Sequence, residues 1–243
     1  MKTILLKLAG PLQSWGTRSH FEIRHTDPHP SKSAIIGILA AATGCRRDDK
    51  AGIRKLNKLH YAVRVDQAGR IIEDYHTAHK YKYTPEEVLD RTYVTRREYL
   101  EDAVFIAAIG SENEQWIEEI VQALEKPYFQ LFAGRRSCPL TADSYLGCLS
   151  DDTLSALKKT PWQAADWYKK TLSPDQNKMV RLRVYSDADL LPEEKTSRLR
   201  RDLAISFSGK SRQYEYRREQ ESEVWVAREP MEILEEHDAF GAL

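Results

Sequence analysis

The sequence of residues 3–11 is TILLKLAGP, an apolar run that a Gly-Pro pair closes. A short run of this hydrophobicity predicts a buried strand, and the Gly-Pro pair predicts that regular structure ends there. A helix is expected next, because Ser31 or Ser33 can cap the apolar stripe that follows and Gly44 is a natural C-terminal stop. The chain is therefore expected to open with a strand followed by a helix.

The same alternation continues to about residue 132. The expected elements are a short helix at 51–60, a strand at 61–66 with a hairpin partner at 70–75, a polar protruding excursion at 76–95, a strand at 101–109, a helix opened by a capping box at 111–114 and ended by Pro127, and a strand at 128–132. This order predicts an α+β fold of the ferredoxin-like or RNA-recognition-motif-like (RRM-like) βαββαβ type. Many unrelated functions share that order, so it predicts a fold class only.

The pattern changes after residue 148. A helical piece at 152–170 precedes short alternating segments at 181–185, 203–207, 214–217 and 224–226. We therefore expect an RRM-like first unit at 1–148 and a smaller β-rich C-terminal unit at 149–243.

Composition excludes several classes of protein. The 243 residues are 41% hydrophobic and 30% charged, and the longest nearly uncharged apolar run, residues 34–43, is too short to span a bilayer. The three cysteines show no CxxC spacing, which excludes a disulfide scaffold or a structural zinc cluster and favours a reducing cytosol. We expect no contact with a membrane and a cytoplasmic location.

The charges cancel, since Lys plus Arg and Asp plus Glu each number 37. Residues 195–218 hold eight cations against two acids, a net of +6, and residues 219–243 hold eight acids against one cation, a net of −7. Such segregation suits a protein that meets RNA on one side and proteins on others, and two solvated faces are the alternative. Zero net charge excludes a protein that coats RNA with a uniformly basic surface, but it does not exclude RNA binding.

The loop GRRSCP at 134–139 is the first candidate RNA contact. Arg135 and Arg136 can bind phosphate oxygens bidentately, Gly134 lets the backbone approach an anion, and Ser137 adds a hydroxyl. The alternative is a solvated turn with two surface arginines. The loop lacks the GxxxxGK[ST] spacing, so nucleotide hydrolysis is not implied.

Two further candidates lie nearer the N-terminus. Trp15 can offer a stacking face to a base, with Gln13 and Ser14 available for hydrogen bonds, although a core Trp that anchors a loop is the alternative. Lys32 and Ser33 lie at the expected helix start, where free N–H groups attract phosphate. A simply well-capped helix is the alternative there.

The excursion interleaves aromatic and cationic residues, as a site for a flexible single strand does. His79, Lys80 and Lys82 lie within it and Arg97 follows it, while nearby acids make a plain solvated hairpin the alternative. The histidines lack metal-ligand spacing, so neither a metal nor a cofactor is expected. Tyr75 and His76, with His79 and Lys80, could in principle serve a metal-independent ribonuclease.

Taken together, these motifs resemble a known family. The chain is similar to CasD-type subunits of type I-E CRISPR surveillance complexes (Cascade), members of the RAMP superfamily. The resemblance covers residues 1–148 densely, and its motifs are LAGPLQSWG at 8–16, GIL at 37–39 with RDD at 47–49, DYHT at 74–77, REYL at 97–100 and GRRSCPL at 134–140. One departure is Ala34, where the family pattern has a glycine.

The resemblance implies an RRM-like fold with a protruding β-hairpin thumb at about residues 76–96. It implies a non-catalytic, antiviral role: binding the repeat-derived 5′ handle of the CRISPR RNA and capping one end of the complex, beside the backbone and large subunits. The thumb would displace a nucleotide near the handle–spacer junction, so target DNA would be met only through the guide. The loops at 10–16 and 134–137 are the handle contacts that the resemblance implies.

Two other functions stay open at this point. The related subunit of type I-C systems cuts repeat RNA, which makes a metal-independent endoribonuclease the alternative function. A purely structural subunit without RNA contact is disfavoured by the loops that combine cations with hydroxyls.

Overall fold

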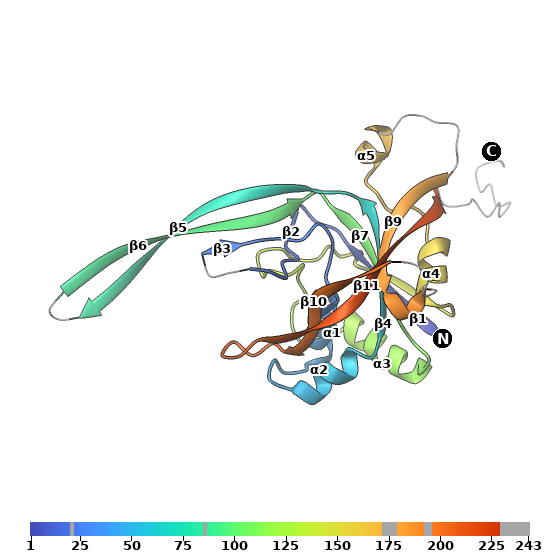
Figure 1. Ribbon diagram of the computed structural model, residues 1–243, viewed down its shortest axis with the longest axis horizontal. Helices are drawn as coiled ribbons and strands as arrows, with labels where there is room; N and C mark the ends of the chain where they lie inside the picture. Colours follow the sequence, from blue (N-terminus) through green and yellow to red (C-terminus); the bar gives the residue numbers. More distant parts are fainter. Residues whose placement is uncertain (20–21, 85–86, 172–178, 192–195, 229–243) are drawn as a thin grey trace, which may run out of the picture.

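A seven-stranded sheet runs through the protein (Figure 1). The computed structural model describes residues 1–19, 22–84, 87–171, 179–191 and 196–228, and excludes the side chains of residues 79–93. In spatial order the strands are β10 (Ser197–Ser206), β11 (Gln213–Ala227), β9 (Met179–Asp187), β4 (His60–Gln67), β7 (Val104–Ser111), β1 (Lys2–Leu8) and β8 (Tyr145–Leu149). All neighbouring pairs are antiparallel. Strands from both parts of the chain share this sheet, because β9 pairs with β4.

Helices cover both faces of the sheet. On one face lie α1 (Lys32–Thr43), α2 (Lys50–Leu56) and α3 (Glu114–Glu125), and on the other lies α4 (Thr153–Lys159). The buried side chains Ile4, Leu6 and Leu8 of β1 join the first core, whereas Leu5 joins the second. Because each such side chain contributes about 1.5–3 kcal/mol on burial, the apolar side chains on both faces of β1 are what a central strand requires.

Capping residues set the helix ends. Ser31 caps α1 by accepting a hydrogen bond from the Ala34 N–H, and Gly44 ends the helix with a φ of 73°, as predicted. The expected cap of α3 is wrong by two residues. Asn113, and not Ser111, accepts the hydrogen bond from the Trp116 N–H at 3.0 Å.

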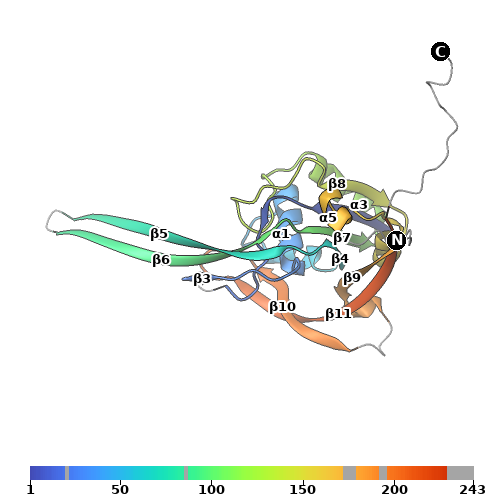
Figure 2. The ribbon, with the colours of Figure 1, turned by 90° about the horizontal axis from the view of Figure 1, so that it is seen from above.

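The predicted hairpin between 61–66 and 70–75 is wrong. β4 pairs with β7 and β9, whereas β5 (Arg70–Thr84) pairs with β6 (Glu87–Glu101) and leaves the sheet as a long two-stranded hairpin (Figures 1 and 2). Its root is tight, since a Cβ at Gly69 would lie 2.5 Å from the Glu101 carbonyl oxygen. The chain therefore turns outward here instead of folding back on β4. The polar excursion of the prediction is the outer part of this hairpin.

Two short strands support the root of the hairpin. β2 (Leu12–Gln13) pairs antiparallel with the end of β6, and β3 (Ile23–Arg24) pairs with it in parallel. The N-terminal loop, which is distant in sequence, is thereby fixed beside residues 96–101.

The strand predicted at 128–132 is wrong as well. The described residues there form only an isolated bridge between Phe132 and Pro139. The N–H groups of Tyr128 and Phe129 instead donate to the last-turn carbonyls of α1, at 3.0 Å each. The segment caps a helix, and β8 takes the place beside β1.

The described C-terminal part is β-rich. Its strands are longer than expected, because the segments predicted at 214–217 and 224–226 belong to one strand, β11. The helix expected at 152–170 is divided into α4 and α5 (Asp166–Thr171), and a 3-10 turn (Ala188–Leu190) follows β9. Within the described residues, no helix is long and apolar enough to cross a membrane.

Candidate nucleic-acid interface

Two loops that the sequence singled out are in contact beside the hairpin root. The Ser14 N–H donates to the Ala133 carbonyl at 3.1 Å. Gly134 has a φ of +82°, and a Cβ there would lie 1.7 Å from the Ser14 carbonyl oxygen. Only glycine combines a left-handed conformation with so close an approach. The loop of residues 10–16 is therefore locked against the loop of residues 134–139.

Gln13 and Trp15 hold the first loop from the inside. Both side chains are buried, with exposures of 0% and 1%. The Gln13 amide donates to the carbonyls of Leu8 and Ala103, and its oxygen accepts from the Trp15 indole N–H at 3.0 Å. This arrangement matches the alternative of a core Trp that anchors a loop. Neither side chain, nor the buried Ser14, presents a surface to a base here.

Arg135 extends from the second loop over the root of the hairpin. Its guanidinium stacks on the Tyr99 ring at 4.5 Å, and its Nη2 donates to the Arg24 carbonyl at 2.9 Å. Its Nη1 is enclosed and has no acceptor among the described residues. The stacked and anchored guanidinium is therefore held in place with a donor unused.

Other arginines surround Arg135. Arg97 on β6 lies opposite Arg24 on β3, and its Nε also lacks an acceptor in the described part of the chain. Arg136 and Ser137 are exposed. We call Arg24, Arg97, Arg135 and Arg136 the arginine surface. Its position on one side of β6, shared with Tyr99, follows from the two-residue period of a strand.

The intervening residue of β6, Glu98, is bound by the N-terminal loop. Glu98 accepts hydrogen bonds from the Thr26 N–H at 3.0 Å and interacts with His25 Nδ1 at 2.9 Å. Burial acts to raise the pKa of Glu98, but these hydrogen bonds outweigh it and hold the pKa below its ordinary value. Glu98 is thus satisfied by the N-terminal loop.

The polar groups at the start of α1 are bound by other residues of the protein. Lys32 is 6% exposed, its Nζ pairs with Asp187 at 2.7 Å, and its N–H donates to Asp202 at 2.9 Å. Ser33 is buried too, with its hydroxyl 3.1 Å from that of Ser31. This matches the alternative of a well-capped helix, and the structure does not bring Lys32 or Ser33 to the arginine surface.

The cationic block of residues 195–218 is partly internal. Arg217 binds Asp202, Asp187 and Glu219, and Arg200 binds Glu219 at 2.9 Å. Burial acts to raise the pKa of Glu219, but Arg200 and its neighbours lower it to about 2. The charges of Arg200 and Arg217 are therefore neutralised within the protein.

The side chains of two of the four residues considered for a ribonuclease are described. Tyr75 and His76 are neighbours on β5 and so point to opposite faces. Lys80, His79 and Lys82 pair in the ladder with Arg91, Thr92 and Leu89, but their side chains lie outside the described residues. Within the described part, no group of three His, Cys, Asp or Glu side chains could hold a metal.

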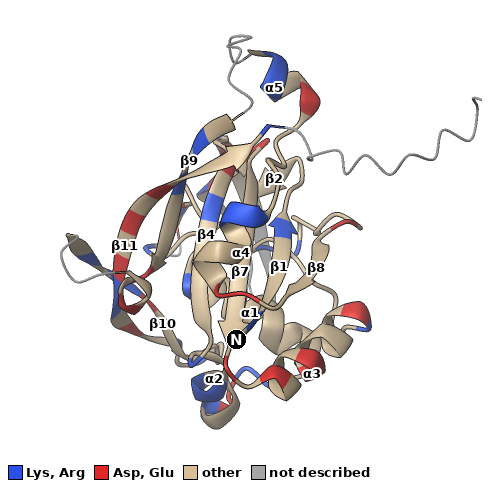
Figure 3. Ribbon diagram, turned by 90° about the vertical axis from the view of Figure 1, so that its right-hand side faces the viewer, with Lys and Arg blue, Asp and Glu red and all other residues tan. Residues whose placement is uncertain are grey.

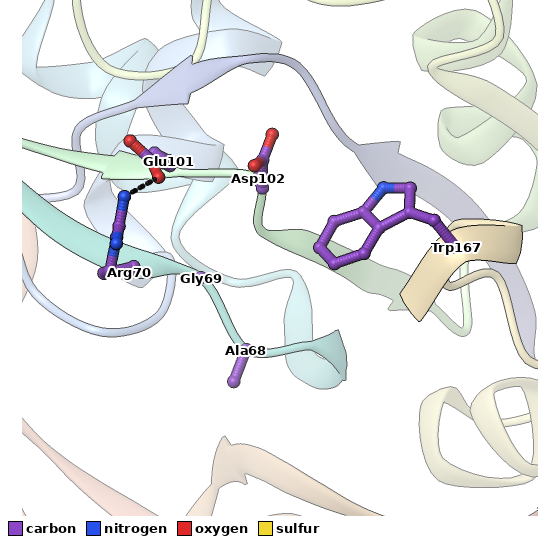
Figure 4. A pocket seen from close by; sticks show the side chains of 6 residues that line it. All are labelled: Ala68, Gly69, Arg70, Glu101, Asp102 and Trp167. Carbon is purple, nitrogen blue, oxygen red and sulfur yellow. Dashed lines mark hydrogen bonds and ion pairs between the residues drawn. The ribbon is translucent and has the colours of Figure 1, made fainter. Parts of the chain in front are cut away.

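A shallow pocket of about 270 Å³ opens at the hairpin root (Figure 4). Arg70 is paired with Glu101 at 2.6 Å, and Asp102 and the Trp167 ring line the rest of it. Its two carboxylates disfavour phosphate, so this pocket is not part of the candidate interface.

Sequence reasoning missed Arg24 and Tyr99. Tyr99 lies two residues after Arg97 in an alternating strand, a spacing that places both on one face. For Arg24, nothing in the sequence indicated the pairing of β3 with β6, which joins residues more than 70 positions apart.

Comparison with known proteins identifies the family. The family described as CRISPR-associated protein (Cas_Cas5) matches residues 3–219. The CRISPR system Cascade subunit CasD of Escherichia coli (strain K12) is 35% identical over 167 residues, which are 63% of this chain and 75% of that protein.

Two solved structures are similar over nearly the whole chain. A chain described as "CRISPR RNA-guided surveillance complex" has a TM-score of 0.74 at 31% identity, covering 93% of this chain and 91% of that one. A second, described as "Crystal structure of Cas protein", has a TM-score of 0.65 at 29% identity, covering 94% of this chain and 99% of that one. This chain belongs to the CRISPR-associated Cas5 family.

Proposed function

We propose that this chain is a non-catalytic RNA-binding subunit of a type I-E Cascade antiviral surveillance complex, acting in the cytoplasm. In this proposal it binds the repeat-derived 5′ handle of the CRISPR RNA. Its family and its similarity to CasD support membership of such a complex. The observation that carries RNA binding is the arginine surface, where Arg24 and Arg136 are exposed and Arg97 and Arg135 are partly exposed.

The arginine surface suits a phosphate backbone. A guanidinium presents a planar fork of donors that matches two phosphate oxygens, and its charge persists at any physiological pH. Arg135 is oriented in advance by the Tyr99 ring and the Arg24 carbonyl. Little conformational freedom remains to be lost on binding, which favours affinity. Arg136 and Ser137, both exposed, extend the same contact.

We assign the hairpin of β5 and β6 to the thumb that crosses the guide near the handle–spacer junction. In this assignment it displaces a nucleotide from pairing with target DNA. Its root carries Arg97 and Tyr99, so RNA bound at the arginine surface would lead onto the hairpin. His79, Lys80 and Lys82 would follow the backbone there.

We further infer that the antiparallel order β8-β1-β7-β4, with α1 and α3 among the helices on one face, is a ferredoxin-like or RRM-like core of residues 1–148. Residues 149–243 would then be a smaller unit that extends the same sheet from β4. Exposed apolar side chains at the hairpin, with exposures of 41–61%, suit contact with the backbone and large subunits. These side chains are Ile23, Ile71, Tyr75 and Val94.

Substitution of the two loop arginines tests handle binding. In the full chain, R135A/R136A should weaken binding of labelled 5′-handle RNA about tenfold. The slope of log Kd against log salt should fall by about 1.4, since each single-strand phosphate contact contributes about 0.7. Fluorescence anisotropy measures both quantities.

The matched control is K158A/K170A, which removes two exposed cations on α4 and α5. It should change the affinity less than twofold. Unchanged binding by R135A/R136A would show that the arginine surface is not the handle site.

A second assay separates binding from catalysis. The full chain is incubated with labelled repeat RNA in the presence of a chelator, and we expect intact RNA. Discrete cleavage that follows the protein through purification would instead establish the endoribonuclease alternative.

A further inference from the structure

A second cationic surface lies around α2, apart from the arginine surface. It comprises eight exposed side chains and, with the exposed Asp48 and Asp49, has a net charge of +6 in a protein of zero net charge. We call it the α2 surface, and its cations are Arg46, Arg47, Lys50, Arg54, Lys55, Lys58, Lys210 and Arg212. In Figure 3 Lys and Arg mark α2, whereas Asp and Glu mark α3 beside it.

Two contacts make this surface continuous. The Phe207 N–H donates to the Arg47 carbonyl at 2.9 Å, and the Lys50 ammonium donates to Gln213 at 3.4 Å. The turn between β10 and β11, which carries Lys210 and Arg212, is therefore joined to the segment that leads into α2.

Only part of the charge of α2 stabilises the helix: Arg54 and Lys55 lie in its last turn, and the Lys55 ammonium lies 5.1 Å from the centre of the Trp116 ring. The helix packs through the buried Ile53 and Leu56, and its exposed residues are cations and one alanine. Lys50 and Arg54 are four residues apart, where like charges destabilise a helix. No acidic residue lies within α2 to offset these cations, whereas on α3 Glu118 pairs with Lys2 of β1 at 2.7 Å. The unmixed face of α2 suits a polyanionic partner.

Two exposed aromatic rings border the α2 surface. Tyr128 and Phe129 are 73% and 52% exposed, and their rings meet edge to face at 4.7 Å. Their N–H groups are hydrogen-bonded to the end of α1, and the Tyr128 ring lies against Gly44, two residues before Arg46. The backbone of this aromatic pair is therefore anchored while the rings face solvent.

We propose that the α2 surface is a second binding site, for single-stranded nucleic acid of any sequence. The cations would follow the phosphate backbone, and Tyr128 and Phe129 would stack on unpaired bases, a combination typical of single-strand binding. An acidic protein fits less well, because protein interfaces are depleted of lysine and have an apolar core. The described residues within the cationic stretch expose no large apolar side chain.

The two nucleic-acid surfaces are separate. In Figure 1 the hairpin extends to the left from the upper part of the molecule, whereas α2 lies at the bottom. The α2 surface is therefore a place distinct from the proposed handle site.

The experiment uses the full chain carrying R135A/R136A and a labelled 20-nucleotide poly(dT). In this background K50E/R54E should weaken binding at least tenfold and reduce the salt slope by at least 1.4. The control K158E/K170E makes the same change in net charge on α4 and α5, and should change the affinity less than twofold. Thermal unfolding of each variant verifies that it is folded.

A second pair of variants tests the rings. Y128L/F129L should weaken poly(dT) binding severalfold with the salt slope unchanged, because stacking is not ionic. The proposal fails if K50E/R54E binds like its control. It also fails if polyglutamate binds as tightly as poly(dT) and the leucine variants bind poly(dT) normally, which would indicate an acidic protein partner.

Discussion

Arginines serve opposite purposes in two regions of this protein. At the start of α1, Arg217 is 8% exposed and bonds to three carboxylates, Asp187, Asp202 and Glu219. On the arginine surface, Arg24 and Arg136 are exposed, and Arg97 and Arg135 are partly exposed. The burial and the carboxylate partners of a guanidinium, more than its presence, thus distinguish a structural cation from one available to a ligand.

The largest expected effect is on the buried network. Replacing Arg217 by Met would leave three buried carboxylates without their shared partner, and we expect unfolding to become easier by about 3–5 kcal/mol. Urea denaturation measures the change. Arg135→Met is the comparison and should lose less than about 1 kcal/mol. Equal losses would remove the distinction between the two regions.

The second-largest effect on stability is expected at the contact between the loops of residues 10–16 and 134–139. Gly134→Ala would force a side chain into a left-handed conformation against the Ser14 carbonyl, and we expect a loss of about 2–3 kcal/mol. Gly209→Ala is the matched control, because a Cβ there meets nothing within 4 Å. A tolerated Gly134→Ala, measured in the same denaturation assay, would show that the loops can separate without cost.

Acid should affect the buried network through His29. Burial and the nearby Arg200 lower its pKa to about 4, whereas an ordinary His has a pKa of 6.5. Between these values the unfolded chain binds a proton that the folded chain does not, so stability falls as the pH falls. From pH 7 to pH 5 this group should remove about 2 kcal/mol.

His29→Gln carries no titrating ring and should flatten that dependence. The measurement is urea denaturation at both pH values. If the free energy of unfolding falls equally in the variant and the parent between pH 7 and pH 5, groups other than His29 cause the acid sensitivity.

The smallest effect on stability is expected from substitution of Tyr99, on whose ring Arg135 stacks. Tyr99→Leu keeps apolar volume but removes the ring on which the guanidinium stacks, so stability should fall by about 1 kcal/mol. Handle-RNA affinity should fall severalfold, because Arg135 loses its orientation. Fluorescence anisotropy compares the effect of Tyr99→Leu in the parent with its effect in R135A. If the two substitutions lower the RNA affinity additively, Tyr99 does not act through Arg135.

Local signals predicted much of the fold. The apolar run of β1, the Ser31 cap and the Gly44 stop have causes within a few residues, and the structure contains all three features. The wrong strand at 128–132 and the wrong hairpin partner of β4 depend on distant contacts, with the end of α1 and with β9. Short-range patterns carry no information about those partners.

The same limit applies to the candidate site. Residue type made Arg135 and Arg136 candidates, and both lie at the surface or partly so. It also selected Trp15 and Lys32, whose burial depends on Gln13 and on Asp187, the latter 155 positions away. Arg24 escaped notice because its neighbour on β6 cannot be identified from the loop that contains it.

The regular ladder of the hairpin fixes its length in discrete units. β5 and β6 pair without a bulge from Arg70 with Glu101 to Thr84 with Glu87, which gives a span of about 50 Å at 3.4 Å per residue. Deleting one residue pair would turn every outer side chain to the opposite face, whereas deleting two would keep the faces and shorten the span by about 7 Å. The length of the hairpin can therefore change only in steps of two cross-strand pairs if each side chain is to keep its face.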